Sequence, residues 1–180
     1  MAETFTFLTV ISLLNILACG CGYAQESRPT REYQIRASLI FNFIQFTTWP
    51  ADVSEPNTLN ICLLGPDYYG AALSALEREI VQGKEIVVKR LGGDLPGSDL
   101  DCRVMIIQYG AADTEKALEE ARQHSLLTIG DTPDFLDKGG IISILLLKEK
   151  IVFDINRAAA HASNVELSSK LLRVARTVKE

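Results

Sequence analysis

The spacing of apolar and polar residues predicts short helices that alternate with short strands along most of the chain. Apolar residues within 32–47 form one wide stripe at helical spacing, and a helix is expected to end near Trp49 because the residue before Pro50 avoids helical backbone angles. Further helices are predicted at 68–79, 112–123 and 133–137, and a last one from the Ser163-x-x-Glu166 capping box through Leu171 to Val178. Strands are predicted at 59–64, 85–91, 104–108, 126–129, 141–147 and 151–155.

The order of these elements predicts an α/β fold. Strands that alternate with helices favour a mainly parallel sheet flanked by helices, in a single three-layer-like domain over residues 32–178. A short polar link joins the runs 141–147 and 151–155, which predicts a late antiparallel hairpin. The wide apolar stripe of the first helix has two interpretations, which are burial against the sheet and an exposed interface.

The first 24 residues have the pattern of a signal peptide. Their apolar run, Phe5 to Leu17, is short for a membrane span and is followed by small residues, as in secretory signals. We expect residues 1–24 to be removed, residues 25–31 to form a flexible lead-in, and the domain to work outside the cytoplasm. Two alternatives stay open: a retained N-terminal membrane anchor, and a lipoprotein signal in which Cys19 becomes the lipidated first residue.

Export changes the interpretation of the four cysteines. Cleavage after Ala24 removes Cys19 and Cys21 and leaves Cys62 and Cys102 in an oxidising compartment. Two cysteines with no third cysteine to pair with predict a disulfide there. The bridge closes a loop of about 40 residues, which stabilises the fold by on the order of 4 kcal/mol. Two separately buried thiols are the alternative.

Charge and residue types point away from several functions. The net charge is −5, whereas nucleic-acid binding needs a basic stripe. The sequence has only two histidines, His124 and His161, and no group of His, Cys, Asp and Glu stands at metal-ligand spacing. We therefore expect no metal, no cofactor, no catalytic residue and no nucleic-acid partner.

Two turns that follow strands carry the candidate residues for ligand or partner contact. Gly65, Asp67 and Tyr68 follow the strand 59–64, and Asn156 and Arg157 follow the strand 151–155. Open α/β sheets bind ligands at such turns. An ordinary turn after Gly65 and helix capping by Asn156 are the alternatives.

Several motifs, taken in their order along the chain, resemble one known family. They are Tyr33-x-x-x-Ala37-x-x-x-Phe41-Asn42-Phe43-x-x-Phe46-x-x-Trp49-Pro50, Ile61-Cys62-Leu63-x-Gly65-x-Asp67, Val81-x-Gly83-Lys84, Leu127-Thr128-Ile129-Gly130-Asp131, Phe135-x-x-x-Gly139-Gly140, Phe153-x-Ile155-Asn156 and Ser168-Ser169-Lys170-Leu171-Leu172-Arg173-x-Ala175. Together they resemble the YfiR/HmsC family of periplasmic regulators over about residues 32–178.

The resemblance implies a regulator and not an enzyme. Members studied as regulators repress a membrane-bound diguanylate cyclase by binding its periplasmic sensor domain, and an OmpA-like outer-membrane lipoprotein can sequester them, so that cyclic-di-GMP and biofilm increase. The resemblance also implies a homodimer and a disulfide between Cys62 and Cys102. Some members carry a second cysteine pair near the late hairpin, which this chain lacks. A regulator of a sensor kinase and a periplasmic small-ligand-binding protein are the alternative functions.

Overall fold

The computed structural model describes residues 30–50, 57–93, 95 and 101–180. The predicted signal peptide with Cys19, the lead-in before residue 30 and the linking residues 51–56 lie outside the described residues. None of the described helices combines the length and the apolar character that a bilayer span requires.

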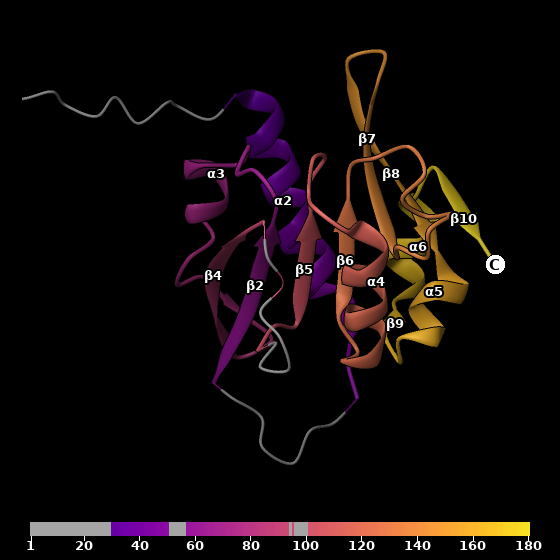
Figure 1. The fold of residues 1–180 in the computed structure, drawn as a ribbon, viewed down its shortest axis with the longest axis horizontal. Helices are drawn as coiled ribbons and strands as arrows, with labels where there is room; N and C mark the ends of the chain where they lie inside the picture. The colour runs from indigo at the N-terminus through magenta and orange to yellow at the C-terminus, as the bar shows by residue number, and fades with distance from the viewer. Residues whose placement is uncertain (1–29, 51–56, 94, 96–100) are drawn as a thin grey trace, which may run out of the picture.

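Within the described residues, eight strands form one sheet in the order β10-β8-β7-β6-β5-β2-β4-β3 (Figure 1). They are β2 (Thr58–Leu64), β3 (Ile80–Val81), β4 (Lys84–Gly92), β5 (Val104–Ile107), β6 (Leu127–Gly130), β7 (Ile142–Leu147), β8 (Lys150–Asn156) and β10 (Thr177–Lys179). Strands β4, β2, β5, β6 and β7 are parallel neighbours, β10 joins β8 in parallel, and β3–β4 and β7–β8 are antiparallel. This topology confirms the predicted α/β class and the late hairpin.

Helices cover both faces of the sheet (Figure 1). They are α2 (Arg31–Gln45), α3 (Ala71–Ser74), α4 (Thr114–Gln123), α5 (Arg157–Ala162) and α6 (Ser169–Val174), and β1 (Thr47–Thr48) pairs with β9 (Glu166–Leu167) in a separate small sheet. Successive residues of β2 face opposite sides, since Ile61 and Leu63 join the core of α2 whereas Cys62 and Leu64 join the core of α4. The sheet therefore separates two apolar layers.

The apolar stripe of α2 is used mainly for the core. Ile40, Phe43 and Ile44 have no exposed surface, and the ring of Phe43 meets that of Phe153 in β8 edge to face, with ring centres 4.8 Å apart. Ile35, near the start of the helix, is 42% exposed. Burial is therefore the correct interpretation for most of the stripe, whereas Ile35 is exposed and Leu39 and Phe41 are half-buried.

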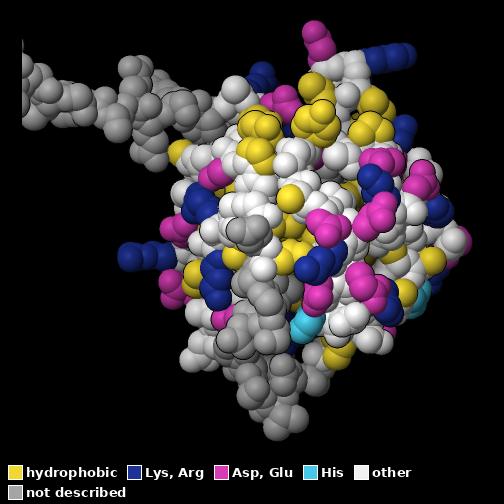
Figure 2. Space-filling view, in the orientation of Figure 1, with side chains coloured by type: hydrophobic (Ala, Val, Ile, Leu, Met, Phe, Trp, Pro, Cys, Tyr) yellow, Lys and Arg dark blue, Asp and Glu magenta, His cyan; other side chains and the backbone are white. Residues whose placement is uncertain are grey.

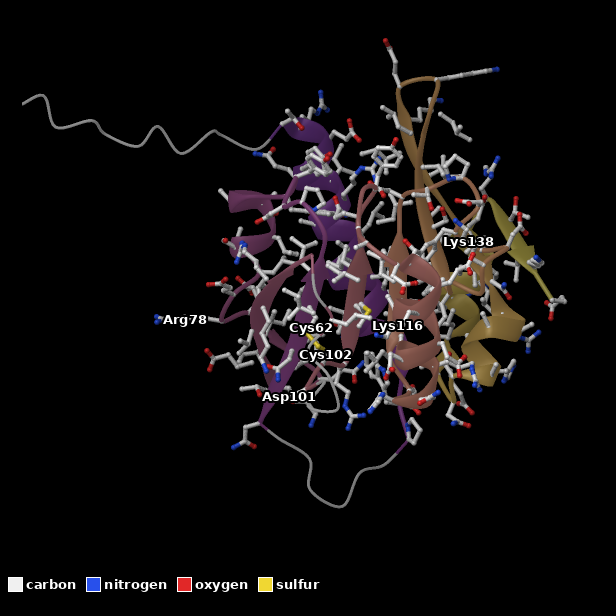
Figure 3. The ribbon with its side chains drawn as sticks, viewed as in Figure 1. Cys62, Arg78, Asp101, Cys102, Lys116 and Lys138 are labelled. Carbon is white, nitrogen blue, oxygen red and sulfur yellow. A yellow bond between two sulfur atoms is a disulfide. The ribbon has the colours of Figure 1, made fainter. Side chains whose placement is uncertain are left out.

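Cys62 in β2 and Cys102 just before β5 form a disulfide, with their Cα atoms 5.9 Å apart (Figure 3). Both residues are buried in the apolar layer on the α4 side of the sheet. The bridge links two strands that are also neighbours in the sheet. It agrees with the prediction from the cysteine count.

The predicted helix 68–79 is wrong in length, because only Ala71–Ser74 is α-helical. Before it, the Asp67 carboxylate accepts two backbone N–H groups and holds a turn. After it, Arg78 has a φ of 68° and donates its N–H to the carbonyl oxygen of Ile86 in β4. Contacts with β4 therefore replace the remaining turns of the predicted helix.

The predicted short helix 133–137 is a series of turns in the structure. Phe135 in its middle is 1% exposed and packs in the layer on the α4 side. Turns allow the backbone to direct this ring inward, where it lies against Gly130 and Gly140.

The predicted C-terminal helix is wrong for most of its length. Ser168, and not Ser163, caps the six-residue helix α6, and Ala175 already has extended backbone angles. Leu171 is 3% exposed, as expected, but Val174 is 69% exposed. The last residues form β10 beside β8. Pairing with a distant strand therefore overrides the local helical spacing.

Candidate functional site

The structure separates the two groups of predicted contact residues. Gly65, Asp67 and Tyr68 follow β2 at the edge where the parallel strands have their carboxyl ends, which we call the carboxyl edge. Asn156 and Arg157 follow β8, which runs antiparallel to β7 and therefore ends at the opposite edge. A single site cannot include both groups.

At the opposite edge, Asn156 has a structural role. Its Oδ1 accepts the N–H of Ala159 at 2.9 Å and caps α5, and its Nδ2 donates to the carbonyl oxygen of Leu136 at 2.9 Å. The residue is 6% exposed. Arg157 is exposed and pairs with the Glu180 carboxylate at 3.1 Å. In the structure, Asn156 thus caps a helix, as the capping alternative states.

At the carboxyl edge, Asp67 organises the turn after β2. Its Oδ1 accepts the N–H groups of Tyr69 and Gly70 at 3.0 and 2.8 Å, and its Oδ2 accepts from Arg90 Nε at 2.7 Å. Burial raises the pKa of Asp67, but the hydrogen bonds from Arg90 and the backbone outweigh it and lower that pKa below its usual value. Asp67 therefore stays ionised and holds the turn that contains Tyr68.

Gly65 lets two turns approach each other at this edge. Its φ is +98°, which favours glycine, and a Cβ atom there would lie 3.1 Å from the Cβ of Ala111 in the turn after β5. The turns after β2 and β5 are therefore packed against each other.

Tyrosines at the ends of neighbouring strands form the exposed part of this edge. Tyr68 follows β2 and is 47% exposed, and Tyr109 follows β5 and is 70% exposed. Ile35 in the first turns of α2 is also exposed. Apolar side chains gather along this upper side of the molecule in Figure 2. We call Ile35, Tyr68 and Tyr109 the carboxyl-edge surface; Tyr109 was missed from the sequence, although its position directly after the predicted strand 104–108 was a usable signal.

A buried polar network supports this surface from below. Arg36 is 7% exposed, and its Nε donates to Glu32 Oε1 at 2.9 Å while its Nη1 donates to the carbonyl oxygen of Ile144 at 3.3 Å. The guanidinium lies 5.8 Å from the ring centre of Tyr33, which meets Tyr69 edge to face at 5.2 Å. The network joins α2, β7 and the turn after β2 into one rigid base.

The pKa shifts of the residues in and around this buried network fit a structural role better than a role in proton transfer. Burial raises the pKa of Tyr33 and strongly raises that of Tyr69, so both phenols stay protonated at neutral pH. Burial also raises the pKa of Asp131, although the N–H of Tyr109, at 2.9 Å from its Oδ1, and the charge of Arg36 oppose the rise. Asp131 thus fixes the backbone of Tyr109.

A cleft of about 410 Å³ lies near the opposite edge, by the small β1–β9 sheet. Its lining residues are Thr48, Trp49, Pro50, His161, Asn164, Val165 and Glu166. Trp49 Nε1 is buried and has no hydrogen-bond partner within the part of the chain that the structure describes. This cleft did not emerge from the sequence, because its residues come from segments far apart in the chain. Among the described residues, no group of three or more His, Cys, Asp and Glu could hold a metal ion.

The fold and this edge define a disulfide-linked α/β domain that offers exposed aromatic side chains on a rigid base. The particular family is shown by its model, described as YfiR/HmsC-like, which matches residues 33–176. The chain therefore belongs to the YfiR/HmsC-like family, and the resemblance seen in the sequence is confirmed. At the level of the family, its members are periplasmic regulators in cyclic-di-GMP signalling.

No curated protein matches the chain. Among solved structures, the fold is similar to a conserved domain protein from Vibrio cholerae O1 biovar El Tor strain N16961, with a TM-score of 0.53 and 14% identity over 82% of this chain. It is also similar to an ABC domain in complex with L-Trp from Streptococcus pneumonia, with a TM-score of 0.53 and 10% identity over 79% of this chain. The chain spans 60% of the length of each. At these identities the likeness concerns the fold alone.

Proposed function

We propose that this chain is a periplasmic, non-enzymatic regulator that binds the periplasmic domain of a membrane-bound diguanylate cyclase and holds the cyclase inactive. Membership of the YfiR/HmsC-like family over residues 33–176 carries the proposal. The disulfide supports it as well, because such bridges persist in oxidising compartments. Residues 1–24 would direct export and then be removed, and Cys19 is the position for a lipid anchor if the lipoprotein alternative is correct.

The carboxyl-edge surface is the part of the described chain that best suits the receptor contact. Exposed tyrosines are enriched among residues that dominate binding energy, since they supply a large apolar area with few rotatable bonds. Tyr68 and Tyr109 stand on a backbone fixed by Asp67 and Asp131. Little conformational freedom is therefore lost when a partner covers them.

Repression follows if the regulator binds the inactive state of the receptor better than the active state. A shift of the receptor from 1:99 to 99:1 requires a difference of about 5.5 kcal/mol in binding free energy between the two states. Contacts that form only with the inactive state would supply this difference, and truncation of a single hot-spot residue costs about 2 kcal/mol or more.

The proposal is tested by deleting the gene in its native host and measuring cellular cyclic-di-GMP. We expect the level to rise, and to fall again when the unchanged protein is restored. The double variant Tyr68→Ala/Tyr109→Ala is expected to fold normally and to fail in this complementation. Val174→Ala is the matched control, because Val174 on helix α6 is an apolar residue that is 69% exposed, close to the 70% of Tyr109.

Three outcomes would change the conclusion. An unchanged cyclic-di-GMP level after deletion would refute the cyclase as receptor, and altered phosphorylation of a response regulator would then support the sensor-kinase alternative. Full repression by the double tyrosine variant would show that the receptor binds elsewhere on the chain.

A homodimer and an OmpA-like outer-membrane lipoprotein that sequesters the regulator belong to the same proposal.

The cleft beside Trp49 favours a second candidate function, the binding of a small periplasmic ligand. The buried indole N–H of Trp49 has no partner among the described residues, and a ligand acceptor could satisfy it. A thermal-shift screen checks this, because a ligand that binds the folded chain adds RT ln(1 + [L]/Kd) to its stability. A hit that Trp49→Phe abolishes would support the ligand site, and a hit unaffected by that change would place the ligand elsewhere.

A further inference from the structure

The β7–β8 hairpin projects beyond the sheet. β7 pairs with β6 only at Ile142 and Ser143, and β8 pairs with β10 only from Asp154 to Asn156. The end of the hairpin, residues 145–152, extends above the other strands in Figure 1, whereas Ile144 and Phe153 at its foot are buried in the core. It therefore lacks strand neighbours on both sides within the described residues.

The projecting end is apolar on both faces. Leu146 opposes Ile151 and Leu145 opposes Val152, and side chains of successive residues point to opposite faces of a strand. Leu146 is 49% exposed, and Leu147, on the other face, is 40% exposed. A flat partner surface covers only one face, so the complementary shape is a groove that receives the hairpin end.

The turn of the hairpin is positively charged overall. It contains Lys148 and Lys150 with only Glu149 between them, and all three are exposed. The whole chain carries a net charge of −5, so an anionic lipid surface would repel most of the molecule. A protein groove with an acidic side chain at its rim fits this end better than a membrane does.

The chain itself presents such a groove between α2 and the segment after α3. This α2–α3 groove is shallow and open to solvent, with a volume of about 300 Å³, and it is lined by Ser38, Phe41, Asn42, Ala75, Leu76 and Glu79. Phe41 and Leu76 form its half-buried apolar walls, and the exposed Glu79 places a carboxylate at its rim. In Figure 1 the hairpin end projects away from α3, so the hairpin and the groove of one chain do not meet.

We propose that the projecting β7–β8 hairpin of one copy inserts into the α2–α3 groove of a second copy. Leu146 and Leu147 would pack on Phe41 and Leu76, and Lys150 would face Glu79. This inference deepens the homodimer included in the proposed function. If the same contact forms in both directions, the dimer closes on itself, as two-fold assemblies do.

The oligomeric state of the mature chain in solution tests the inference. Sedimentation equilibrium is expected to show a dimer whose dissociation constant rises at least tenfold in Leu146→Ser/Leu147→Ser. Ser38→Arg, which fills the groove from an exposed position, is expected to weaken the dimer as strongly. Val174→Ser is the matched control and should leave the dimer unchanged, since that residue is exposed on α6.

A charge exchange separates self-association from other occupants. Lys150→Glu and Glu79→Lys are each expected to weaken the dimer. The chain that carries both changes is expected to have a dissociation constant within about threefold of the original value. A monomer at all concentrations, or a dimer insensitive to these changes, would overturn the inference.

Two further readouts keep this inference distinct from the proposed function. If the original chain is monomeric and the hairpin variants no longer repress cyclic-di-GMP, the hairpin contacts the receptor and not a second copy. Loss of binding to anionic vesicles in those variants would assign it to lipid. Conversely, the dimer and its charge exchange can be correct even if the cyclase is not the receptor.

Discussion

At the scale of the residue, the packing of Phe135 shows why two glycines stand in this region. A Cβ atom at Gly130 would lie 2.4 Å from the ring of Phe135, and one at Gly140 would lie 2.2 Å from it. Both distances are too short for a real contact, so the ring occupies space that only two glycines leave free. The motif read in the sequence is therefore a packing requirement.

We predict that Gly140→Ala lowers the free energy of unfolding by about 1–3 kcal/mol, the usual cost of an added methyl group in a packed core. Denaturant unfolding measures the change. Gly93→Ala is the matched control, because no described atom other than those of its chain neighbours lies within 4 Å of its Cβ position. Equal stability of the two variants would show that the ring moves aside without cost.

At the scale of the element, the β7–β8 hairpin combines a firm base with an unfavourable turn. Its two-residue turn places Lys148 at a φ of 47° and Glu149 at a φ of 64°. Positive φ at both turn positions is typical of the type I′ turn, for which Asn-Gly is preferred. Two ordinary L-residues in this conformation raise the energy of the folded state.

Lys148→Asn/Glu149→Gly is therefore expected to stabilise the protein by roughly 1 kcal/mol, as relief of left-handed backbone strain does. Thermal unfolding at fixed pH provides the measurement. The control Lys148→Ala/Glu149→Ala removes the same side chains without favouring positive φ, and it should give no gain. A gain in the alanine control equal to that of Asn-Gly would attribute the effect to charge.

At the scale of the whole molecule, the disulfide joins the middle of the sheet and shortens the unfolded chain. Cys62 and Cys102 are 40 residues apart in sequence and lie in neighbouring elements of the fold. Since the loop between them includes α3 and β4, the unfolded state loses much of its conformational freedom when the bridge is closed.

Reduction is expected to lower the free energy of unfolding by about 4 kcal/mol, from the entropy of a loop of this length. For a domain of this size that corresponds to a fall in Tm of roughly 10 °C. Melting curves with and without reductant measure it, and the Cys62→Ala/Cys102→Ala variant should not respond to reductant. Identical curves for the unchanged protein would mean that the bridge contributes nothing to stability.

Much of the fold could be predicted because its signals are local. The buried strands β2, β5 and β6 are short apolar runs, and α2 has a clear helical stripe. The disulfide followed from the cysteine count and the family from ordered motifs. Of the carboxyl-edge surface, only Tyr68 was identified from the sequence. The position of Tyr109 after a predicted strand was an unused signal, whereas Ile35 joins that edge only after the helix has been packed on the sheet.

The sequence by itself determined which segments are apolar enough to form the centre of the sheet and which two cysteines remain to be joined. Only the tertiary structure decided where helices stop, because the chain after Ala175 pairs with β8 and the chain after Arg78 pairs with β4. It also decided that Asn156 lies at the edge opposite Tyr68, since β8 runs against its neighbour β7. Strand pairing joins residues far apart in the sequence, and local spacing holds no information about such partners.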